Sequence, residues 1–217
     1  KLKKLGYEFK YGNLKDALYE EFSAEAISIK KYSDLNVLFE EDKNTESSGV
    51  IDTFGGTLQK DGYRIQKGQY TLNTKVTLNR DAKDVFSFFS SPLNLGFLTP
   101  SWMKFRILEV PDTIEAGSRI IYRINLGILG IKFNWTTKVV TWHPDQVFVD
   151  IQESGPYSLW FHQHTIRSTD SGLVEMGDLV IYRVPFGILG KVAHRLFIKK
   201  TLTRIFNYRR KVIQMRF

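Results

Sequence analysis

Alternating hydrophobic and polar residues predict a series of β-strands in the second part of the chain. Two segments, Thr71–Arg80 and Arg119–Leu126, show the pattern best. In the second, Ile120, Tyr122 and Ile124 share one face, with charged or polar residues among the positions on the other. A period of two residues is typical of strands with one buried face. Further strands are expected around Phe105–Val110, Phe133–Val139, Val147–Glu153, Leu159–Ser168 and Leu173–Val184.

Short connections between these segments favour an antiparallel meander. Gly127 and Gly130 bracket one turn, and Pro144-Asp145 is expected to form the next. Gly155-Pro156-Tyr157 is predicted to make a further turn, although Tyr157 could also lie at the mouth of a cavity.

Two short helices and one long helix complete the pattern. Asp81 is a suitable N-cap for a helix over Ala82–Ser90, and Pro92–Pro100 is expected to form a second short helix. Gly187–Phe217 can run for about 45 Å as a helix, at a rise of about 1.5 Å per residue. Its apolar stripe would consist of Leu189, Val192, Leu196, Leu202, Ile205, Phe206, Val212 and Ile213.

This order of elements predicts an α+β fold. A curved antiparallel β-sheet of about six to seven strands would wrap around the long C-terminal helix, with two short helices after the first strand. Such a sheet and helix leave a space between them, and a space of this kind suits an apolar guest. No catalytic signature in the sequence is as strong as this arrangement.

Five segments resemble a known superfamily: SPLNLGFLTPSWMKFRI, GSRIIYRINLGILGIKFNWTTKV, FVDIQESGPYSLWFHQHTI, GDLVIYRVPFGILG and IFNYRR. With them, residues 71–217 resemble the START-like, Bet v 1-like (SRPBCC) proteins, in the bacterial polyketide-cyclase and ligand-binding branch. The resemblance implies a helix-grip fold with an apolar cavity. The implied ligand is a hydrophobic or amphipathic small molecule, such as a lipid, an isoprenoid or a polyketide-like compound.

The first residues read as the end of a different unit. The opening KLKKLGYEFKYGNLKDALYEEF is similar to the C-terminal tail of epimerase-like short-chain dehydrogenases, and proteins that join the two parts are sometimes labelled cell division inhibitors. No glycine-rich dinucleotide fingerprint is present, so the resemblance transfers no oxidoreductase activity. We expect a dehydrogenase-like tail over 1–25, a linker with extra strands over 26–70 and a START-like domain over 71–217. The start at Lys1 suggests a piece of a longer polypeptide.

The amino-acid composition excludes several kinds of chemical site. The chain has no cysteine, which excludes disulfides, thiolate catalysis and Cys-based zinc sites and fits a cytoplasmic protein. Aromatic residues make up 14% of the chain, enough both to fill a core and to line a cavity. The residues expected to contact a ligand are Phe97, Trp102, Tyr122, Phe133, Trp135, Tyr157, Trp160, His162, His164 and Tyr182.

Positive charge gathers at the C-terminal end. The net charge is +8, and no acidic residue follows Asp178. Lys199, Lys200, Arg204 and Arg209–Lys211 lie on the predicted helix, where they form either a solvated face or a weak contact with an anionic membrane surface. Nucleic acid is not an expected partner because no motif for reading it is present.

Histidines on one predicted strand are the main candidates for chemistry. Trp160, His162 and His164 alternate, so they share a face. A three-residue hairpin at Asp170-Ser171-Gly172 would set His164 opposite Asp178, His162 opposite Val180 and Trp160 opposite Tyr182. Three interpretations stay open: a polar pair that fixes the strand register, a polar group that orients a ligand, and a general acid/base pair.

A metal site is not predicted, because His162 and His164 would need a third ligand such as Asp178 or His143. Nor is a cofactor expected. Arg183 could meet a ligand carboxylate, but a surface contact is the favoured interpretation.

We therefore expect a binding module for a hydrophobic small molecule, with Pro92–Pro100 or Leu126–Ile131 as a movable lid. One alternative is a cyclase- or dehydratase-like enzyme that uses His164, His162 and Asp178; an enzyme is the less favoured interpretation. Another is an accessory interaction domain for a fused or docked dehydrogenase-like partner.

Overall fold

The computed structural model describes residues 59–60, 63–64, 66, 68–126 and 131–217. The strands are β1 (Gln59–Lys60), β2 (Tyr63–Arg64), β3 (Tyr70–Leu78), β4 (Arg106–Glu109), β5 (Arg119–Asn125), β6 (Lys132–His143), β7 (Val147–Ser154), β8 (Leu159–Ser168) and β9 (Val174–Arg183). The helices are α2 (Ala82–Phe89), the 3₁₀-helices η4 (Pro92–Gly96) and η5 (Ser101–Met103), α3 (Gly187–Ala193), the π-helical η6 (His194–Ile198) and α4 (Lys199–Arg216).

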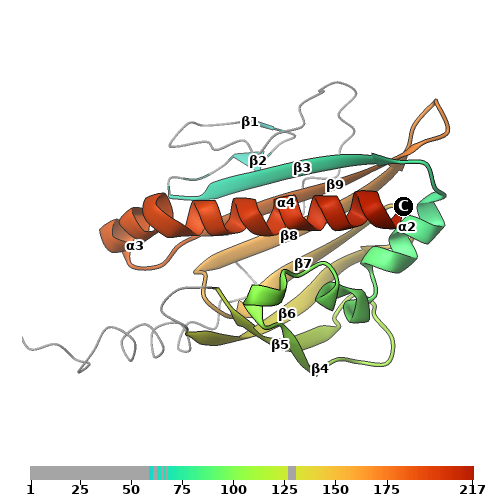
Figure 1. Cartoon of the computed structure of the whole chain (residues 1–217). Coiled ribbons are helices and arrows are strands. Elements are labelled where there is room, and N and C mark those ends of the chain that lie inside the picture. Colours follow the sequence, from blue (N-terminus) through green and yellow to red (C-terminus); the bar gives the residue numbers. More distant parts are fainter. Residues whose placement is uncertain (1–58, 61–62, 65, 67, 127–130) are drawn as a thin grey trace, which may run out of the picture.

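Seven of the strands form one antiparallel sheet in the order β3-β9-β8-β7-β6-β5-β4. Strands β4 to β9 follow one another as a meander, and β3 closes the edge by pairing with β9. The chain from α3 to α4 runs across one face of this curved sheet, and its C-terminal end lies beside α2 (Figure 1). The α+β helix-grip fold predicted from the sequence is therefore confirmed.

The core lies between the sheet and the C-terminal helix. Ile198, Leu202 and Phe206 pack against apolar side chains of the sheet, including Trp135 and Trp160. At the other end, Ile213 and Phe217 meet the apolar side of α2; the rings of Phe88 and Phe217 are 5.4 Å apart at their centres. Burial of these large apolar groups holds the helix against the sheet.

Most predicted elements appear within a residue or two of their expected bounds, and one short helix differs in kind. The segment Pro92–Pro100 forms the short 3₁₀-helix η4, and η5 follows after Pro100. Asp81 takes the N-cap position of α2, but its side chain makes no capping hydrogen bond. In the predicted linker over 26–70, where extra strands are expected, Tyr63 lies in β2 and Tyr70 begins β3.

The prediction for the start of the long helix is wrong. Leu189, Val192 and Leu196 are expected in the buried stripe, but they are 76%, 51% and 58% exposed. The buried face instead follows Gly190, His194, Ile198, Leu202, Phe206 and Ile213. The cause is the π-helical turn at His194–Ile198, which accommodates one extra residue and so rotates the earlier turns relative to the later ones.

Some predictions fall outside the described residues. They are the dehydrogenase-like tail over 1–25, most of the linker over 26–70, and the central residues of the Leu126–Ile131 hairpin. Within the described part of the chain, no helix combines the length and apolar character that crossing a bilayer requires.

Candidate functional site: a cavity with a buried polar cluster

A cavity of about 160 Å³ lies between the sheet and α4. Strands β5 to β8 form one wall, and Leu202, Ile205, Phe206 and Arg209 of α4 form the opposite one. Among the lining residues, Pro92, Leu95, Phe105, Ile114 and Ile205 are only partly buried. We therefore place the opening of the cavity between η4, the β4–β5 connection and α4.

Six of the ten residues predicted to contact a ligand line this cavity: Tyr122, Trp135, Tyr157, Trp160, His162 and His164. Those on the strands point inward because strand residues with a spacing of two share a face. Tyr157, at the predicted turn after β7, is 4% exposed and packs against Trp135 and Trp160.

The other four predicted contact residues lie elsewhere. Phe97 is expected inside but is 68% exposed, because it follows η4 on the outer side. Phe133 is buried in the core, and Trp102 contacts the guanidinium of Arg204, which lies 5.0 Å from its ring centre. Tyr182 donates or accepts a hydrogen bond of 2.8 Å with His194 Nε2, so it holds α3 and η6 to the sheet.

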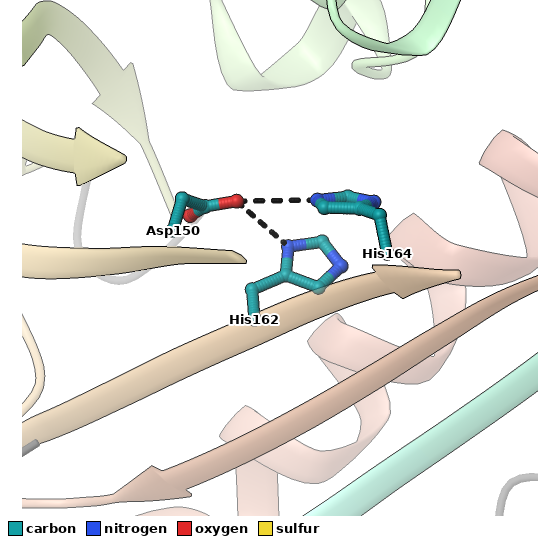
Figure 2. A group of neighbouring side chains, drawn as sticks. All are labelled: Asp150, His162 and His164. Carbon is teal, nitrogen blue, oxygen red and sulfur yellow. Dashed lines mark hydrogen bonds and ion pairs between the residues drawn. The ribbon is translucent and has the colours of Figure 1, made fainter. Parts of the chain in front are cut away.

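A cluster of five ionisable side chains lies in and behind the inner wall of the cavity. It consists of Asp150 on β7, His162 and His164 on β8, Asp178 on β9 and Arg209 on α4. Asp178 Oδ1 is 3.0 Å from His162 Nε2 and 2.8 Å from His164 Nδ1. Asp150 Oδ2 is 3.1 Å from His164 Nε2 and 3.8 Å from His162 Nδ1. The carboxylate of Asp150 points toward both rings (Figure 2).

Strand register explains how the cluster forms. His164 faces Asp178, His162 faces Val180 and Trp160 faces Tyr182, so the predicted register is confirmed. The hairpin that sets it also has the predicted form: Thr169 N donates to Leu173 O at 2.8 Å, and Gly172 has a φ of 75°. On the other side of β8, Asp150 faces His162 and Phe148 faces His164.

Arg209 brings positive charge into this site. Its Nε atom lies 3.6 Å from Asp178 Oδ2, and its side chain is 9% exposed. A further contact of 3.4 Å joins one of its terminal nitrogens to His164 Nδ1. Thr74 Oγ1 donates to Asp178 Oδ2 at 3.4 Å, so Asp178 has partners on three sides.

The surroundings shift the pKa values of two members of the cluster. Burial of His162, reinforced by the neighbouring His164, lowers the pKa of His162 to about 4. Burial alone would raise the pKa of Asp178, but Arg209 and the hydrogen bonds from both histidines hold it well below its usual range. Asp178 is therefore a carboxylate, and His162 is a neutral imidazole.

Sequence reasoning misses Asp150 and Arg209. Both leave a signal: Asp150 shares the face of Phe148 on a predicted strand, and Arg209 continues the spacing of Leu202 and Phe206 on the buried side of the helix. The sequence pattern groups Arg209 with the surface charges, but it is 7% exposed.

His143, one of the two residues considered as a third metal ligand, lies exposed at the end of β6.

Three further polar groups bear on the cavity. Tyr122 Oη and Thr137 Oγ1 form a hydrogen bond of 3.1 Å on the lining wall, and burial raises the pKa of Tyr122. Trp135 Nε1 is buried without a hydrogen-bond partner. Arg183, by contrast, lies outside the cavity, where it contacts Gln66 Oε1 at 3.3 Å.

The arrangement supports three kinds of chemistry. The apolar walls can remove a guest from water, and the few polar groups can orient it. The histidines and carboxylates could transfer protons to a bound molecule. Asp150, His162 and His164 each offer one ligand atom, all within 4.8 Å of one another, so they could also hold a metal ion.

Comparisons with solved structures agree with the fold described above. No protein-family model matches the sequence, and no curated protein matches it. An aromatase/cyclase of Streptomyces sp. R1128 superposes with a TM-score of 0.53 and 14% identity, over 67% of this chain and 91% of that chain. A protein of Thermus thermophilus superposes with a TM-score of 0.52 and 14% identity, over 67% of this chain and 95% of that chain. With the seven-stranded sheet and its long helix, these likenesses show that the chain has the helix-grip fold.

Proposed function

We propose that this domain binds a hydrophobic or amphipathic small molecule in the cavity between the sheet and α4. The observation that carries the proposal is the cavity itself, which is walled by apolar side chains and has a polar cluster at its inner wall. Removal of the guest's apolar surface from water would supply most of the binding free energy, at about 25 cal/mol per Å². The polar groups would select and orient its polar end.

Two neighbouring residues of β6 allow a matched test. Val139 lines the cavity, whereas Val140 packs against the apolar cluster on the opposite face of the sheet. The Val139→Phe variant should fill the cavity and lower the affinity for the apolar dye 8-anilinonaphthalene-1-sulfonate at least tenfold. The Val140→Phe variant should bind the dye like the unchanged protein. Equal binding by both variants would contradict the proposal.

The second candidate is an enzyme of the cyclase or dehydratase kind. It is favoured by the buried His162, His164 and Asp178 beside an apolar space, and one structural neighbour is an aromatase/cyclase. In this case His164 would exchange a proton with the guest. Incubation with linear polyketone thioesters, followed by mass spectrometry of the products, tests it. His164→Ala should abolish turnover in an enzyme and leave dye binding near normal in a binding module.

We also propose that the surface of α3 and η6 contacts an anionic membrane. Five large apolar side chains are exposed there: Ile188, Leu189, Val192, Leu196 and Phe197. Exposed basic side chains alternate with them, at Lys191, Arg195, Lys199 and Lys200. A helix face that combines apolar and basic residues matches the interface of an anionic bilayer. The predicted charge at Arg209 does not contribute, since that residue is buried.

Vesicle co-sedimentation tests this contact. Leu189→Asp should reduce binding to vesicles that contain phosphatidylglycerol several-fold. Met215→Asp is the matched control, because Met215 is 79% exposed at the other end of the same helical stretch and Leu189 is 76% exposed. Equal binding by both variants, or equal binding to uncharged phosphatidylcholine vesicles, would count against the proposal. The fused dehydrogenase-like partner and the cytoplasmic location remain predictions from the sequence.

A further inference from the structure

Both histidines of the cluster direct a ring nitrogen to the same oxygen atom. Asp178 Oδ1 is 3.0 Å from His162 Nε2 and 2.8 Å from His164 Nδ1. A bare nitrogen lone pair facing a carboxylate oxygen at these distances would be repulsive, so each nitrogen carries a proton and donates it. The contact from Arg209 to His164 Nδ1 is longer, at 3.4 Å, and does not change this choice.

These proton positions determine which of the other ring nitrogens carry lone pairs. When both rings are in the neutral form, each has one N–H, and His162 Nδ1 and His164 Nε2 then carry lone pairs. Both face Asp150 Oδ2, at 3.8 Å and 3.1 Å. Two lone pairs and a carboxylate oxygen therefore converge with no proton between them, and such a group needs a proton or a cation at its centre.

We propose that Asp150, His162 and His164 bind a divalent first-row transition-metal ion, with Zn²⁺ as the representative, and that Asp178 orients the two histidines. Two imidazoles and one carboxylate are a common donor set for Zn²⁺ and Fe²⁺. Ligands about 2.1 Å from such an ion lie roughly 3 to 3.5 Å apart, as tetrahedral or octahedral geometry requires. The two nitrogen–oxygen separations, 3.1 and 3.8 Å, are close to that range, and all three donor atoms lie within 4.8 Å of one another.

The residues behind the ligands support the same site. Ligating histidines usually donate their other N–H to a carboxylate, which fixes the tautomer and strengthens the ligand. Here one carboxylate, Asp178, serves both rings, and Arg209 in turn balances its charge at 3.6 Å. Asp150, His162 and His164 all line the cavity, so the open coordination positions would face the space proposed for the guest.

Metal titration of the chelator-treated full chain tests the site. Isothermal titration with ZnCl₂ should show one tight equivalent, and CoCl₂ should give the visible absorption bands of cobalt bound to histidine and carboxylate. Asp150→Asn and His164→Gln should each weaken Zn²⁺ binding by on the order of 100-fold or more. Asp178→Asn leaves all three ligands in place and should weaken it by about 10- to 100-fold.

His143→Gln is the matched control, because His143 is an exposed histidine outside the cluster. This variant should keep the tight equivalent. Circular dichroism and dye binding show whether each variant still folds, and Asp150, at 17% side-chain exposure, is the member whose replacement disturbs the core least. Zn²⁺ binding no tighter than that of surface histidines, or tight binding that survives Asp150→Asn in a folded protein, would overturn the inference. Dye binding without metal binding would overturn it and leave the proposed cavity function intact.

Discussion

His164 on β8 lies directly across the strand pair from Asp178 on β9, and its Nδ1 atom is 2.8 Å from Asp178 Oδ1. This contact links two strands of the sheet at the inner wall of the cavity. Because Asp178 also holds His162 and faces Arg209, the pair connects the sheet to the helix that closes it.

Loss of the Asp178 charge should destabilise the protein. Asp178→Asn leaves the buried guanidinium of Arg209 without its carboxylate, and breaking a buried pair in this way costs about 3–5 kcal/mol. Urea denaturation measures the change in the free energy of unfolding. The double variant Asp178→Asn with Arg209→Gln should cost clearly less than the sum of the two single variants, because it leaves no unpaired charge. Strictly additive costs would show that the two side chains do not interact.

Stability of the chelator-treated protein should fall as the pH is lowered from 6.5 toward 4. The pKa of His162 is lowered to about 4 in the folded protein, from 6.5 when unperturbed. Between these two pH values His162 binds a proton in the unfolded chain but not in the folded protein. Stability therefore falls by up to about 1.4 kcal/mol per pH unit. Below pH 4 stability continues to fall because of Asp178. The pKa of this carboxyl group lies well below 3.8 in the folded protein, so it is protonated first in the unfolded chain.

Denaturation curves between pH 7 and 4.5, with a chelator present, measure this slope. The other titratable and charged groups of the cluster, which are Asp150, His164, Asp178 and Arg209, contribute to the total, so the comparison must be between variants. His162→Gln should reduce the slope of the unfolding free energy against pH by up to about 1.4 kcal/mol per pH unit, the contribution of one proton. His143→Gln is the control variant, since that side chain is exposed and lies outside the cluster. Identical slopes in both variants would contradict the assignment.

Gly190 should be irreplaceable at the start of the C-terminal helix. A Cβ at this position would overlap the carbonyl oxygen of Pro185 and lie 3.3 Å from Val184 Cγ1. Because the obstacle is backbone, Gly190→Ala should cost about 3 kcal/mol, at the upper end for overpacked sites. Gly96→Ala is the control: its Cβ would meet only Phe105 Cδ1 at 3.9 Å, an ordinary contact. Thermal denaturation of the two variants should differ accordingly.

Local rules are enough to predict the strands and their register. The hairpin at Gly172 fixes the pairing of β8 with β9 through turn chemistry alone, so the neighbours of His164 follow from the sequence. The meander requires no long-range information beyond short connections, and its order is the observed one.

What the sequence could not supply depends on contacts between distant segments. The buried state of Arg209 requires Asp178 from another element to compensate it, and a helical residue with a charge is otherwise expected at the surface. The exposure of Leu196 follows from the π-helical turn, which no simple period of 3.6 residues anticipates. Phe97 is the C-cap residue of the 3₁₀-helix η4, a type of helix that the sequence pattern does not distinguish, and it is 68% exposed.

Trp135 should act as the hydrogen-bond donor that selects guests with an acceptor group. Its Nε1 atom is buried without a partner, and its ring lines the cavity. Trp135→Phe removes the N–H and should weaken the binding of acetophenone about fivefold, which corresponds to about 1 kcal/mol for one net hydrogen bond. Isopropylbenzene has nearly the same shape and no acceptor, so its affinity should change little or rise slightly with the added space. Because both guests lose the same ring contacts, the difference between them isolates the N–H, and competition with the dye measures it. Equal losses for the two guests would mean that Trp135 contributes only apolar surface.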